Sequence, residues 1–482
     1  MTGQKTSALD KRTKWSYCVG ATGRDMAYAL VSMFLINYIQ YTMNLTIAQY
    51  SAISAILVVC LIWDAINDPM MGIIIENSHL KAGKYRPWIL LGVIINAIII
   101  ILLFTLRPQG WLFVAFFGVS YLCWGMSFTM NDIAYWGLLP SLTSDPKERN
   151  TLVSLMCIFC SLGQFTVAGV IPMIVAGSAI NAYRFAALAV ALSFLAFQLL
   201  TFFGVKENPR PKKSDALSLK DMFRIFFRND QLVTAGIACL LFNIGNGLLI
   251  LMGMNFFYFD FGYSKGGSLI FTFTVMYGLG TILAQGSYAT LAKYFTRKKM
   301  LSFLTCAIAV AYTLFFITGK IIPQTPLLLN IEGFLIFFFQ GLFNMNVVVM
   351  LNNTIEYDEY RFNERHESII SAVRSFAVKL SSAINQGIQA LILIISGIYT
   401  ISQKISSLEN QAGAGKISSE EVLLQADNYI STASSLQRMT LRLGITLIPV
   451  LVILSAYILL KRKYKIDEDE YNRLVNEIEK RA

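Results

Sequence analysis

Four aspartates stand in otherwise apolar stretches, and the spacing of two of them indicates the chemistry of cation binding. Asp64 and Asp68 lie four residues apart in the string WDAINDPMMG (63–72), so on a helix they share one face. Two carboxylates this close repel each other unless a proton or a cation is shared between them. Hard cations prefer several oxygen ligands, and the Thr129 hydroxyl supplies another oxygen. These residues predict a site for a monovalent cation or a proton.

The other two aspartates lie beside groups suited to a ligand rich in hydroxyls. In the string WGMSFTMNDIAYW (124–136), Asp132 and Trp136 are four residues apart. The carboxylate can accept hydrogen bonds from hydroxyls while the indole stacks on the apolar face of a sugar ring. Arg24 and Asp25 offer a hydrogen-bond donor next to an acceptor. A sugar isomer with its hydroxyls in other positions would leave these two groups without their hydrogen bonds. These four residues predict a sugar site, and the alternative is that the acids form structural ion pairs between helices.

The elements that must hold these residues are membrane-spanning helices. Of the 482 residues, 55% are hydrophobic and 14% are charged, whereas a soluble domain carries roughly 25% charged residues. This composition excludes a disordered chain, a disulfide scaffold and an ordinary soluble enzyme. Backbone groups in lipid must be satisfied within the segment, so the apolar runs are expected to be helices. The predicted spans are 15–42, 45–76, 87–106, 110–138, 150–177, 181–205, 231–261, 266–292, 299–319, 325–354, 368–399 and 439–460.

The positive charges predict the orientation of these spans. With the N-terminus in the cytoplasm, 29 of the 40 lysines and arginines fall in cytoplasmic segments and eight on the opposite side. Cytoplasmic loops of membrane proteins carry such an excess of basic residues. An odd number of spans would destroy the alternation, so both termini are predicted to be cytoplasmic. The net charge of +11 therefore indicates orientation in a lipid bilayer, and no nucleic-acid partner is predicted.

The order of the spans indicates a duplicated architecture. Six predicted spans lie in residues 1–205 and precede a basic linker at 206–230. Six more lie in residues 231–460, and a short tail follows at 461–482. The loop HLKAGKYRPW (79–88) has a basic counterpart, LAKYFTRKKML (291–301), at the matching place in the second half. Two six-helix halves around a central site are typical of transporters that rock between two states. We predict an all-α membrane protein of twelve transmembrane helices, of the major facilitator type.

The second half carries fewer features with evident chemistry. All four deep acids are expected in the first half, and Lys379, in the middle of a span, is expected to counterbalance them. A polar stretch at about 400–438 interrupts the second half, and Ser418 begins a pattern typical of a helix cap. We expect a short helix there on the extracytoplasmic side, within a solvated and dispensable insertion.

Three long strings resemble one family, the glycoside–pentoside–hexuronide:cation symporters, of the melibiose permease type. They are WDAINDPMMG with GKYRPWILLG (83–92), YLCWGMSFTMNDIAYWGLLPSLTSDPKER (121–149) and NTIEYDEYRFNERHESIISAVRSFAVK (353–379). The resemblance covers nearly the whole chain, and such long strings are specific. It implies sugar transport driven by a cation, with both sites in the first half.

The resemblance also implies roles for single residues. It places Asp64, Asp68 and Thr129 at the family's cation site, and Lys379 at a charged position near both sites. It places Asp25, Asp132, Trp136 and Arg24 at the sugar site, and a cytoplasmic gate at Arg149, Glu356 and Arg365. One departure concerns specificity, because the family's sugar-binding arginine in the fifth span is replaced by Cys157. Preference for α-galactosides is therefore in doubt.

The sequence thus predicts symport of a glycoside or related small sugar with sodium or protons across the plasma membrane, with no resident cofactor. One alternative keeps the fold but carries a lipid-like or zwitterionic substrate. A second is a membrane sensor that no longer transports, although the tail offers little room for a signalling domain. An enzyme is not expected, because no His, Cys or Ser constellation faces a plausible pocket. The sequence leaves open which sugar and which cation are carried.

Overall fold

The computed structural model consists of helices joined by short connections, and it describes residues 10–78, 83–143, 146–207, 219–364 and 367–481. Within these ranges, eleven helices are long and apolar enough to cross a membrane. The first expected span is a segmented helix formed by α1 (Lys11–Ala29), a π-helical turn η1 (Leu30–Phe34) and α2 (Leu35–Thr42). The predicted all-helical membrane fold is confirmed, and the helices agree with twelve expected spans.

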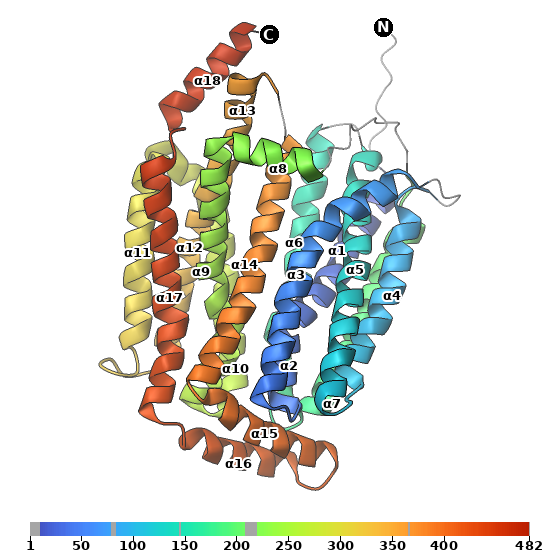
Figure 1. The fold of residues 1–482 in the computed structure, drawn as a ribbon, viewed down its shortest axis with the longest axis vertical. Helices are drawn as coiled ribbons and strands as arrows, with labels where there is room; N and C mark the ends of the chain where they lie inside the picture. The colour runs from blue at the N-terminus through green and yellow to red at the C-terminus, as the bar shows by residue number, and fades with distance from the viewer. Residues whose placement is uncertain (1–9, 79–82, 144–145, 208–218, 365–366, 482) are drawn as a thin grey trace. The chain divides into compact units, whose positions relative to one another are not determined.

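Contacts divide the chain into two compact units. Unit 1 comprises Met1–Ala216, Gly262–Gly267 and Tyr399–Thr432, and unit 2 comprises Leu217–Phe261, Ser268–Ile398 and Ala433–Ala482. The other helices of unit 1 are α3 (Ile47–Glu76), α4 (Arg86–Thr105), α5 (Gly110–Leu142), α6 (Pro146–Val175), α7 (Ala179–Gly204), most of α15 (Ile398–Gly413) and α16 (Ser419–Ser431) (Figure 1). Unit 2 holds α8 (Leu219–Arg228), α9 (Asp230–Phe261), most of α10 (Tyr263–Tyr294), α11 (Arg297–Ile317), α12 (Pro326–Asn352), α13 (Thr354–Phe362), α14 (Glu367–Ile395), α17 (Ser435–Lys463) and α18 (Glu468–Arg481).

In unit 1, helix α1 packs closely against both α6 and α7. A Cβ on Gly163 of α6 would collide with the backbone oxygen of Thr22, so only glycine allows this approach. Membrane helices commonly meet at such small residues. Gly23 serves the same purpose toward α7, where a Cβ would lie 2.8 Å from the Cα of Phe194. The close packing fixes the part of α1 that carries Arg24.

Two tyrosines join α1 to α5. The rings of Tyr17 and Tyr135 stack with their centroids 4.6 Å apart. Each hydroxyl donates to the backbone oxygen of the other residue, and the Tyr17 bond measures 3.1 Å. Both side chains are buried in an apolar cluster that also contains Leu138 and Met156. This reciprocal contact sets the register between the two helices that hold the sugar-site residues predicted from the sequence.

At the predicted cytoplasmic end of unit 1, a single carboxylate organises the loop before α4. Glu207, just after α7, accepts hydrogen bonds from the backbone N–H groups of Lys84 (2.6 Å), Tyr85 (3.1 Å) and Arg86 (2.6 Å). These groups lie at the start of a helix, where backbone donors lack internal partners and negative charge is favoured. Gly83 has φ +117°, and a Cβ there would lie 2.7 Å from the carboxylate. This contact explains the glycine of the GKYRP string.

Unit 2 has a counterpart at the matching place. Glu468, after α17, accepts hydrogen bonds from the backbone N–H of Arg297 at 2.6 Å and from its side-chain Nε at 3.1 Å. Arg297 begins α11, as Arg86 begins α4. In each unit, a glutamate that follows the last spanning helix thus caps the start of the third spanning helix, which is α4 in unit 1 and α11 in unit 2. The basic loops that suggested a duplication therefore share a structural device that the sequence did not show.

Replacing Glu207 by alanine is expected to lower the free energy of unfolding by about 1–3 kcal/mol, because backbone donors lose their acceptor. Thermal unfolding of the purified protein measures this loss. Glu479→Ala is the matched control, since Glu479 is an exposed glutamate on α18. Equal melting temperatures for the two variants would contradict the capping role.

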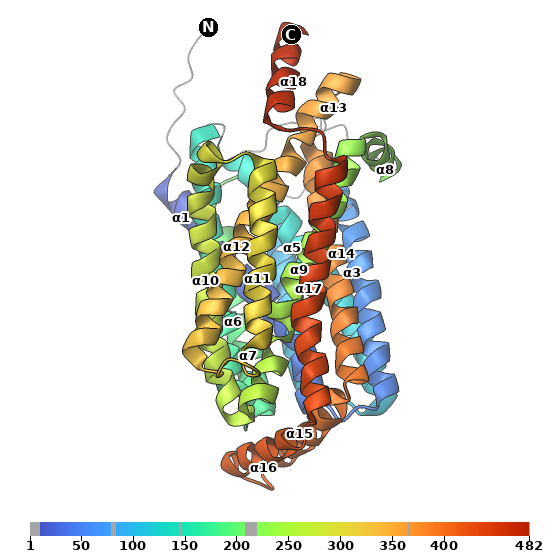
Figure 2. The same ribbon diagram turned by 90° about the vertical axis from the view of Figure 1, so that its left-hand side faces the viewer.

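The stretch expected to be a solvated insertion is instead a packed helical hairpin. Helix α16 begins as predicted, and the Ser418 hydroxyl accepts from the backbone N–H of Glu421 at 3.2 Å. A second helix, α15, precedes it, and its residues Ile405, Leu408 and Glu409 are buried. In both views α15 and α16 lie side by side (Figures 1 and 2). The expectation of a solvated segment is wrong because α15 presents an apolar face to the rest of unit 1.

Candidate functional site

The predicted cation ligands come together between α3 and α5. The Thr129 hydroxyl lies 2.9 Å from Oδ1 of Asp64 and 3.1 Å from Oδ1 of Asp68. Asp64 and Asp68 face α5 together because they are one helical turn apart on α3. Thr129 is 2% exposed, whereas both aspartates are half-buried. Three oxygens from two helices therefore converge on one place.

The geometry of this cluster favours a positive charge close to its oxygens. A threonine hydroxyl carries one proton and donates it to one acceptor at a time. When Thr129 donates to one aspartate, its lone pairs face the oxygen of the other, and two carboxylates repel as well. A proton or a small cation shared by these oxygens removes both conflicts. The cluster therefore fits a hard monovalent cation or a proton, which are the ligands predicted from the sequence.

Hydrogen bonds hold the facing helix in position. Gly125 lies one turn before Thr129 on α5, and a Cβ there would make ordinary contact with Oδ1 of Asp64 at 3.5 Å. On its other side, α5 is bound to α4 by amide side chains. Asn96 donates to the backbone oxygen of Trp124 at 3.0 Å, and Asn131 donates to that of Ile89 at 2.9 Å. These buried bonds hold the segment that carries Thr129 and, three residues later, Asp132.

The predicted sugar ligands also lie together, around the Arg24 guanidinium. Its Nη2 lies 2.9 Å from Oδ2 of Asp25, and its Nη1 lies 3.0 Å from Oδ1 of Asp132. The guanidinium carbon lies 5.6 Å from the ring centre of Trp136 and 4.9 Å from that of Tyr135. Helices α1 and α5 thus supply one group that combines two carboxylates, a guanidinium and an indole.

Burial differs among these residues in a way that matters for binding. Arg24 is 4% exposed, whereas the side chains of Asp25 and Asp132 are 22% and 36% exposed. Trp136 is 42% exposed. The arginine therefore forms the base of the group, and the carboxylates and the indole remain accessible. Such an arrangement presents hydrogen-bond acceptors beside an apolar ring, as a sugar requires.

The structure corrects one part of the sequence interpretation. Asp25 and Asp132 are not carboxylates that lack a basic partner, because Arg24 neutralises one of the two charges. The alternative that the acids form structural ion pairs is therefore partly correct for Asp25 and Asp132, because both pair with Arg24. The sequence identified all three residues but not their pairing, which depends on the register of α1 against α5. The group of three keeps a net charge of −1 when all are ionised.

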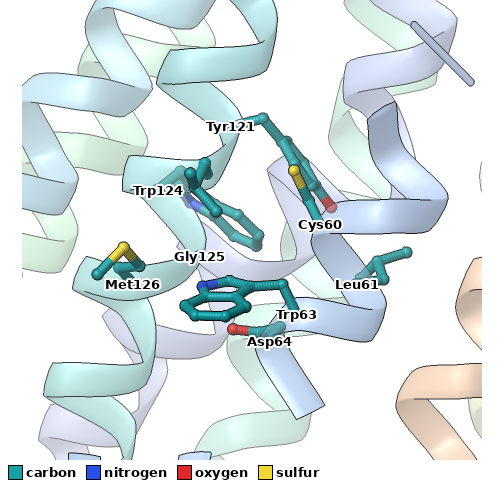
Figure 3. Close-up of a pocket in the computed structure, with 9 residues that line it drawn as sticks. Cys60, Leu61, Trp63, Asp64, Tyr121, Trp124, Gly125 and Met126 are labelled. Carbon is teal, nitrogen blue, oxygen red and sulfur yellow. The ribbon is translucent and has the colours of Figure 1, made fainter. Parts of the chain in front are cut away.

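A narrow recess beside Asp64 was not foreseen from the sequence. It lies between α3 and α5 and contains about 230 Å³, including space open to solvent. Figure 3 shows the Trp63 ring of α3 next to the Asp64 carboxylate, and Trp124 and Tyr121 come from α5. The Trp124 indole N–H is buried and has no hydrogen-bond partner. Asp64 therefore borders on space that a water molecule or a small ion can enter.

Three of the remaining four predicted residues lie on other helices. Lys379 lies on α14 of unit 2 and is half-buried. Arg149 lies on α6, where its Nη2 donates to the backbone oxygen of Thr143 at 3.3 Å. Glu356 is half-buried on α13, and Arg365 lies outside the described residues. Their roles in coupling and gating stay predictions.

Unit 2 contains buried charges that the sequence interpretation missed. Glu332 on α12 is 3% exposed and lies within two turns of the start of that helix. Its Oε1 accepts from the Thr318 hydroxyl at 2.6 Å. Nearby, Arg442 of α17 is 5% exposed, and it pairs with Asp260 of α9 and donates to the backbone oxygens of Phe316 and Thr318. The sequence feature that could have revealed this buried acid was Glu332 itself, a charged residue within the predicted span 325–354. This network ties the ends of four helices together.

Comparisons with known proteins agree with this architecture. The model of a family described as "MFS/sugar transport protein" matches residues 16–468. The lactose permease of Lactobacillus helveticus is 27% identical over 416 residues, which are 80% of this chain and 62% of that relative. The raffinose carrier protein of Pediococcus pentosaceus is 25% identical, over 80% of this chain and 62% of its own length. The chain thus spans less than two thirds of the length of either relative.

A solved structure supports the fold. A bacterial homolog of the human lysosomal transporter Spinster superposes with a TM-score of 0.64 at 12% identity, covering 96% of this chain and 98% of that one. The relatives carry the names of permeases and carriers, in agreement with the prediction of a transporter rather than an enzyme. The resemblance inferred from the three strings is confirmed at the level of the family. This multi-pass membrane protein belongs to the MFS/sugar transport family.

Proposed function

We propose that the protein is a secondary transporter that couples the movement of a small sugar or glycoside to that of sodium or a proton. The observation that carries the proposal is the Thr129 hydroxyl, which lies within hydrogen-bond distance of both Asp64 and Asp68. The group around Arg24 lies near it on α1 and α5 and offers hydrogen-bond acceptors beside an indole. The names of the lactose and raffinose relatives support a sugar as substrate.

The two groups communicate through α5. Thr129 and Asp132 are one turn apart, so a cation that orders Thr129 also orders the backbone that positions Asp132. Each ligand then raises the affinity for the other by the same factor, because coupling between binding sites is reciprocal. With both ligands bound, the buried negative charge falls, which favours passage of the loaded halves past each other. Lys379, Arg149, Glu356 and Arg365 complete the proposal as coupling and gating residues.

The proposed location is the plasma membrane, with both termini in the cytoplasm. The distribution of basic residues supports this orientation, because 29 of 40 fall in the segments that the predicted spans assign to the side of the termini. The capped basic loops before α4 and α11 would then face the cytoplasm in both halves.

Counterflow in proteoliposomes tests the substrate class. Vesicles loaded with lactose, raffinose or a pentoside are diluted into the same labelled sugar, and transient accumulation is expected for at least one glycoside. A panel of lysolipids and zwitterionic compounds serves as the comparison. Accumulation of a lipid-like compound together with failure of every glycoside would contradict the proposal.

Cys157→Arg is expected to shift preference toward galactosides. Cys157 is exposed on α6, and Cys160, one turn later, has its thiol 3.4 Å from Nη2 of Arg24. An arginine at 157 would place a second bidentate donor near the sugar hydroxyls, and each added charged hydrogen bond is worth about 1.5–3 kcal/mol. Competition by lactose against a non-galactoside measures the shift, with Cys157→Ser as the control. Unchanged affinity and selectivity would remove position 157 from the sugar site.

A further inference from the structure

The hairpin of α15 and α16 belongs to a different unit from the helices that it connects. It follows α14 and precedes α17 in the chain, and both of these helices lie in unit 2. The hairpin itself, Tyr399–Thr432, lies in unit 1 (Figure 1). An insertion that only extended unit 2 would make its contacts with α14 and α17, the helices next to it in the chain. The contacts of the hairpin therefore need an explanation of their own.

An apolar and aromatic seam holds α15 to the start of α3. The rings of Tyr399 and Tyr50 stack with their centroids 4.3 Å apart, and both residues are at most 2% exposed. The Tyr399 hydroxyl donates to the backbone oxygen of Leu45 at 3.0 Å. Farther along the hairpin, Ile405 and Val422 are fully buried. Separation of this seam would return large apolar side chains to water.

Polar side chains of α15 satisfy the backbone of the turn between α2 and α3. Gln403 accepts from the backbone N–H of Leu45 at 2.9 Å and donates to the backbone oxygen of Gln40 at 3.1 Å. Asn410 donates to the backbone oxygen of Thr42 at 2.7 Å. Its own oxygen accepts from Nη2 of Arg107, which follows α4, at 2.8 Å. Backbone groups at this turn would lose their partners if α15 left.

Glu409 anchors the centre of the hairpin. It is 1% exposed, and its carboxylate accepts from the backbone N–H groups of Gly177 (2.9 Å) and Ala179 (2.7 Å). These groups lie at the start of α7, where backbone donors lack partners inside the helix. The Tyr263 hydroxyl donates to the same carboxylate at 2.8 Å. A buried charge with three donors is costly to expose and still more costly to leave without them.

The connection between α9 and α10 joins the same assembly. Asp427 of α16 accepts from the backbone N–H of Tyr263 and from the Ser264 hydroxyl, both at 2.5 Å. Gly262 has φ +94°, and a Cβ there would lie 2.7 Å from the Asp427 carboxylate. Two connections between helices of unit 2 are thus fixed within unit 1 by polar contacts, which are buried at Glu409 and partly exposed at Asp427.

We propose that the α15–α16 hairpin is a permanent outer cap of the first half, and that the chain bends at Gly397 and at residues 432–434 when the halves move. The inference rests on the proposed transport cycle, which requires such movement. Gly397 has φ +72°, a conformation that favours glycine, and it lies between α14 and α15. Residues 433–434 are not helical, and they lie between α16 and α17. The cap thus remains on unit 1 while its two joints absorb the motion.

A reversible cross-link tests whether the cap stays in place. The Ser406 hydroxyl lies 3.1 Å from Oδ1 of Asn44, so cysteines at these positions are close enough to oxidise. Transport by the Ser406→Cys/Asn44→Cys protein is expected to agree within about twofold before and after oxidation, with each single variant as a control. Loss of transport on oxidation that a reductant restores would overturn the proposal and identify a latch that opens in every cycle.

A matched pair of glycine variants tests the joint. Gly397→Ala is expected to lower the turnover of transport by about fivefold without changing sugar affinity, because hinge positions absorb backbone motion. Gly415→Ala places a similar backbone strain inside the hairpin, at φ +70° with nothing within 4 Å of the added Cβ, whereas a Cβ at Gly397 also lies 2.9 Å from Nε2 of Gln437, at the flexible end of a side chain. It is expected to retain the wild-type turnover. Equal effects of the two variants on turnover would contradict a hinge at Gly397. Absence of transport by the wild-type protein would instead contradict the proposed function.

Discussion

Asp68→Cys is expected to abolish accumulation of sugar against a gradient while leaving some downhill exchange. The substitution removes one of the two carboxylates that converge on Thr129, 3.1 Å from its hydroxyl. A hydrogen bond or ion contact to a charged group is worth about 1.5–3 kcal/mol, which corresponds to about 10- to 150-fold in cation affinity. The sugar group around Arg24 does not include Asp68, so exchange of sugar across the membrane persists. Gradient-driven uptake and counterflow in the same proteoliposomes separate the two activities.

Variants of Thr129 supply the control for this prediction. Thr129→Ser keeps the hydroxyl between the two aspartates and is expected to retain accumulation. Thr129→Val has nearly the same shape but lacks the oxygen, and it is expected to resemble Asp68→Cys. Unchanged accumulation in Asp68→Cys, or equal behaviour of the serine and valine variants, would contradict a coupling cation at this place.

Arg24→Gln is expected to abolish sugar binding and to destabilise the protein. Arg24 is 4% exposed and pairs with Asp25 and Asp132. Loss of the charged contacts to Arg24 is expected to cost about 1.5–3 kcal/mol, because the two partly exposed carboxylates lose their compensating charge. Sugar binding by titration calorimetry and the melting temperature of the purified protein measure the two effects. Wild-type affinity in this variant would place the sugar elsewhere.

A second substitution separates the structural and the binding role of Arg24. Asp132→Asn in the Arg24→Gln background removes one of the two carboxylates that lost Arg24 and is expected to restore most of the lost stability. It does not restore sugar binding, because a charged donor and a charged acceptor are both missing. Recovery of binding together with stability would show that Arg24 serves only to hold the helices in place.

The sequence predicted the spans well because burial in lipid imposes long apolar runs. Even so, it did not predict the π-helical turn at Leu30–Phe34, since no residue type there requires one. It also missed α15, although Ile398, Ile401, Ile405 and Leu408 repeat at intervals typical of an amphipathic helix. The polar residues between them suggested a loop, and only the contacts with α2 and α3 explain why they are polar.

The candidate site was predicted as a set of residues rather than as an arrangement. Asp64 and Asp68 lie on one helix, so their proximity follows from helical geometry alone. The pairing of Arg24 with Asp132 joins residues 108 positions apart and depends on the Tyr17–Tyr135 contact. The capping roles of Glu207 and Glu409 likewise depend on partners distant in the chain. Local patterns do not contain such long-range information.

The central claim is that a cation at Asp64, Asp68 and Thr129 prepares the neighbouring group for sugar. The most direct test is uptake of the transported sugar by proteoliposomes with and without sodium, at acidic and at neutral pH. We expect that either sodium or a more acidic medium raises the apparent sugar affinity by about 5- to 150-fold, the usual range for coupling between sites. The same affinity under all four conditions would contradict it.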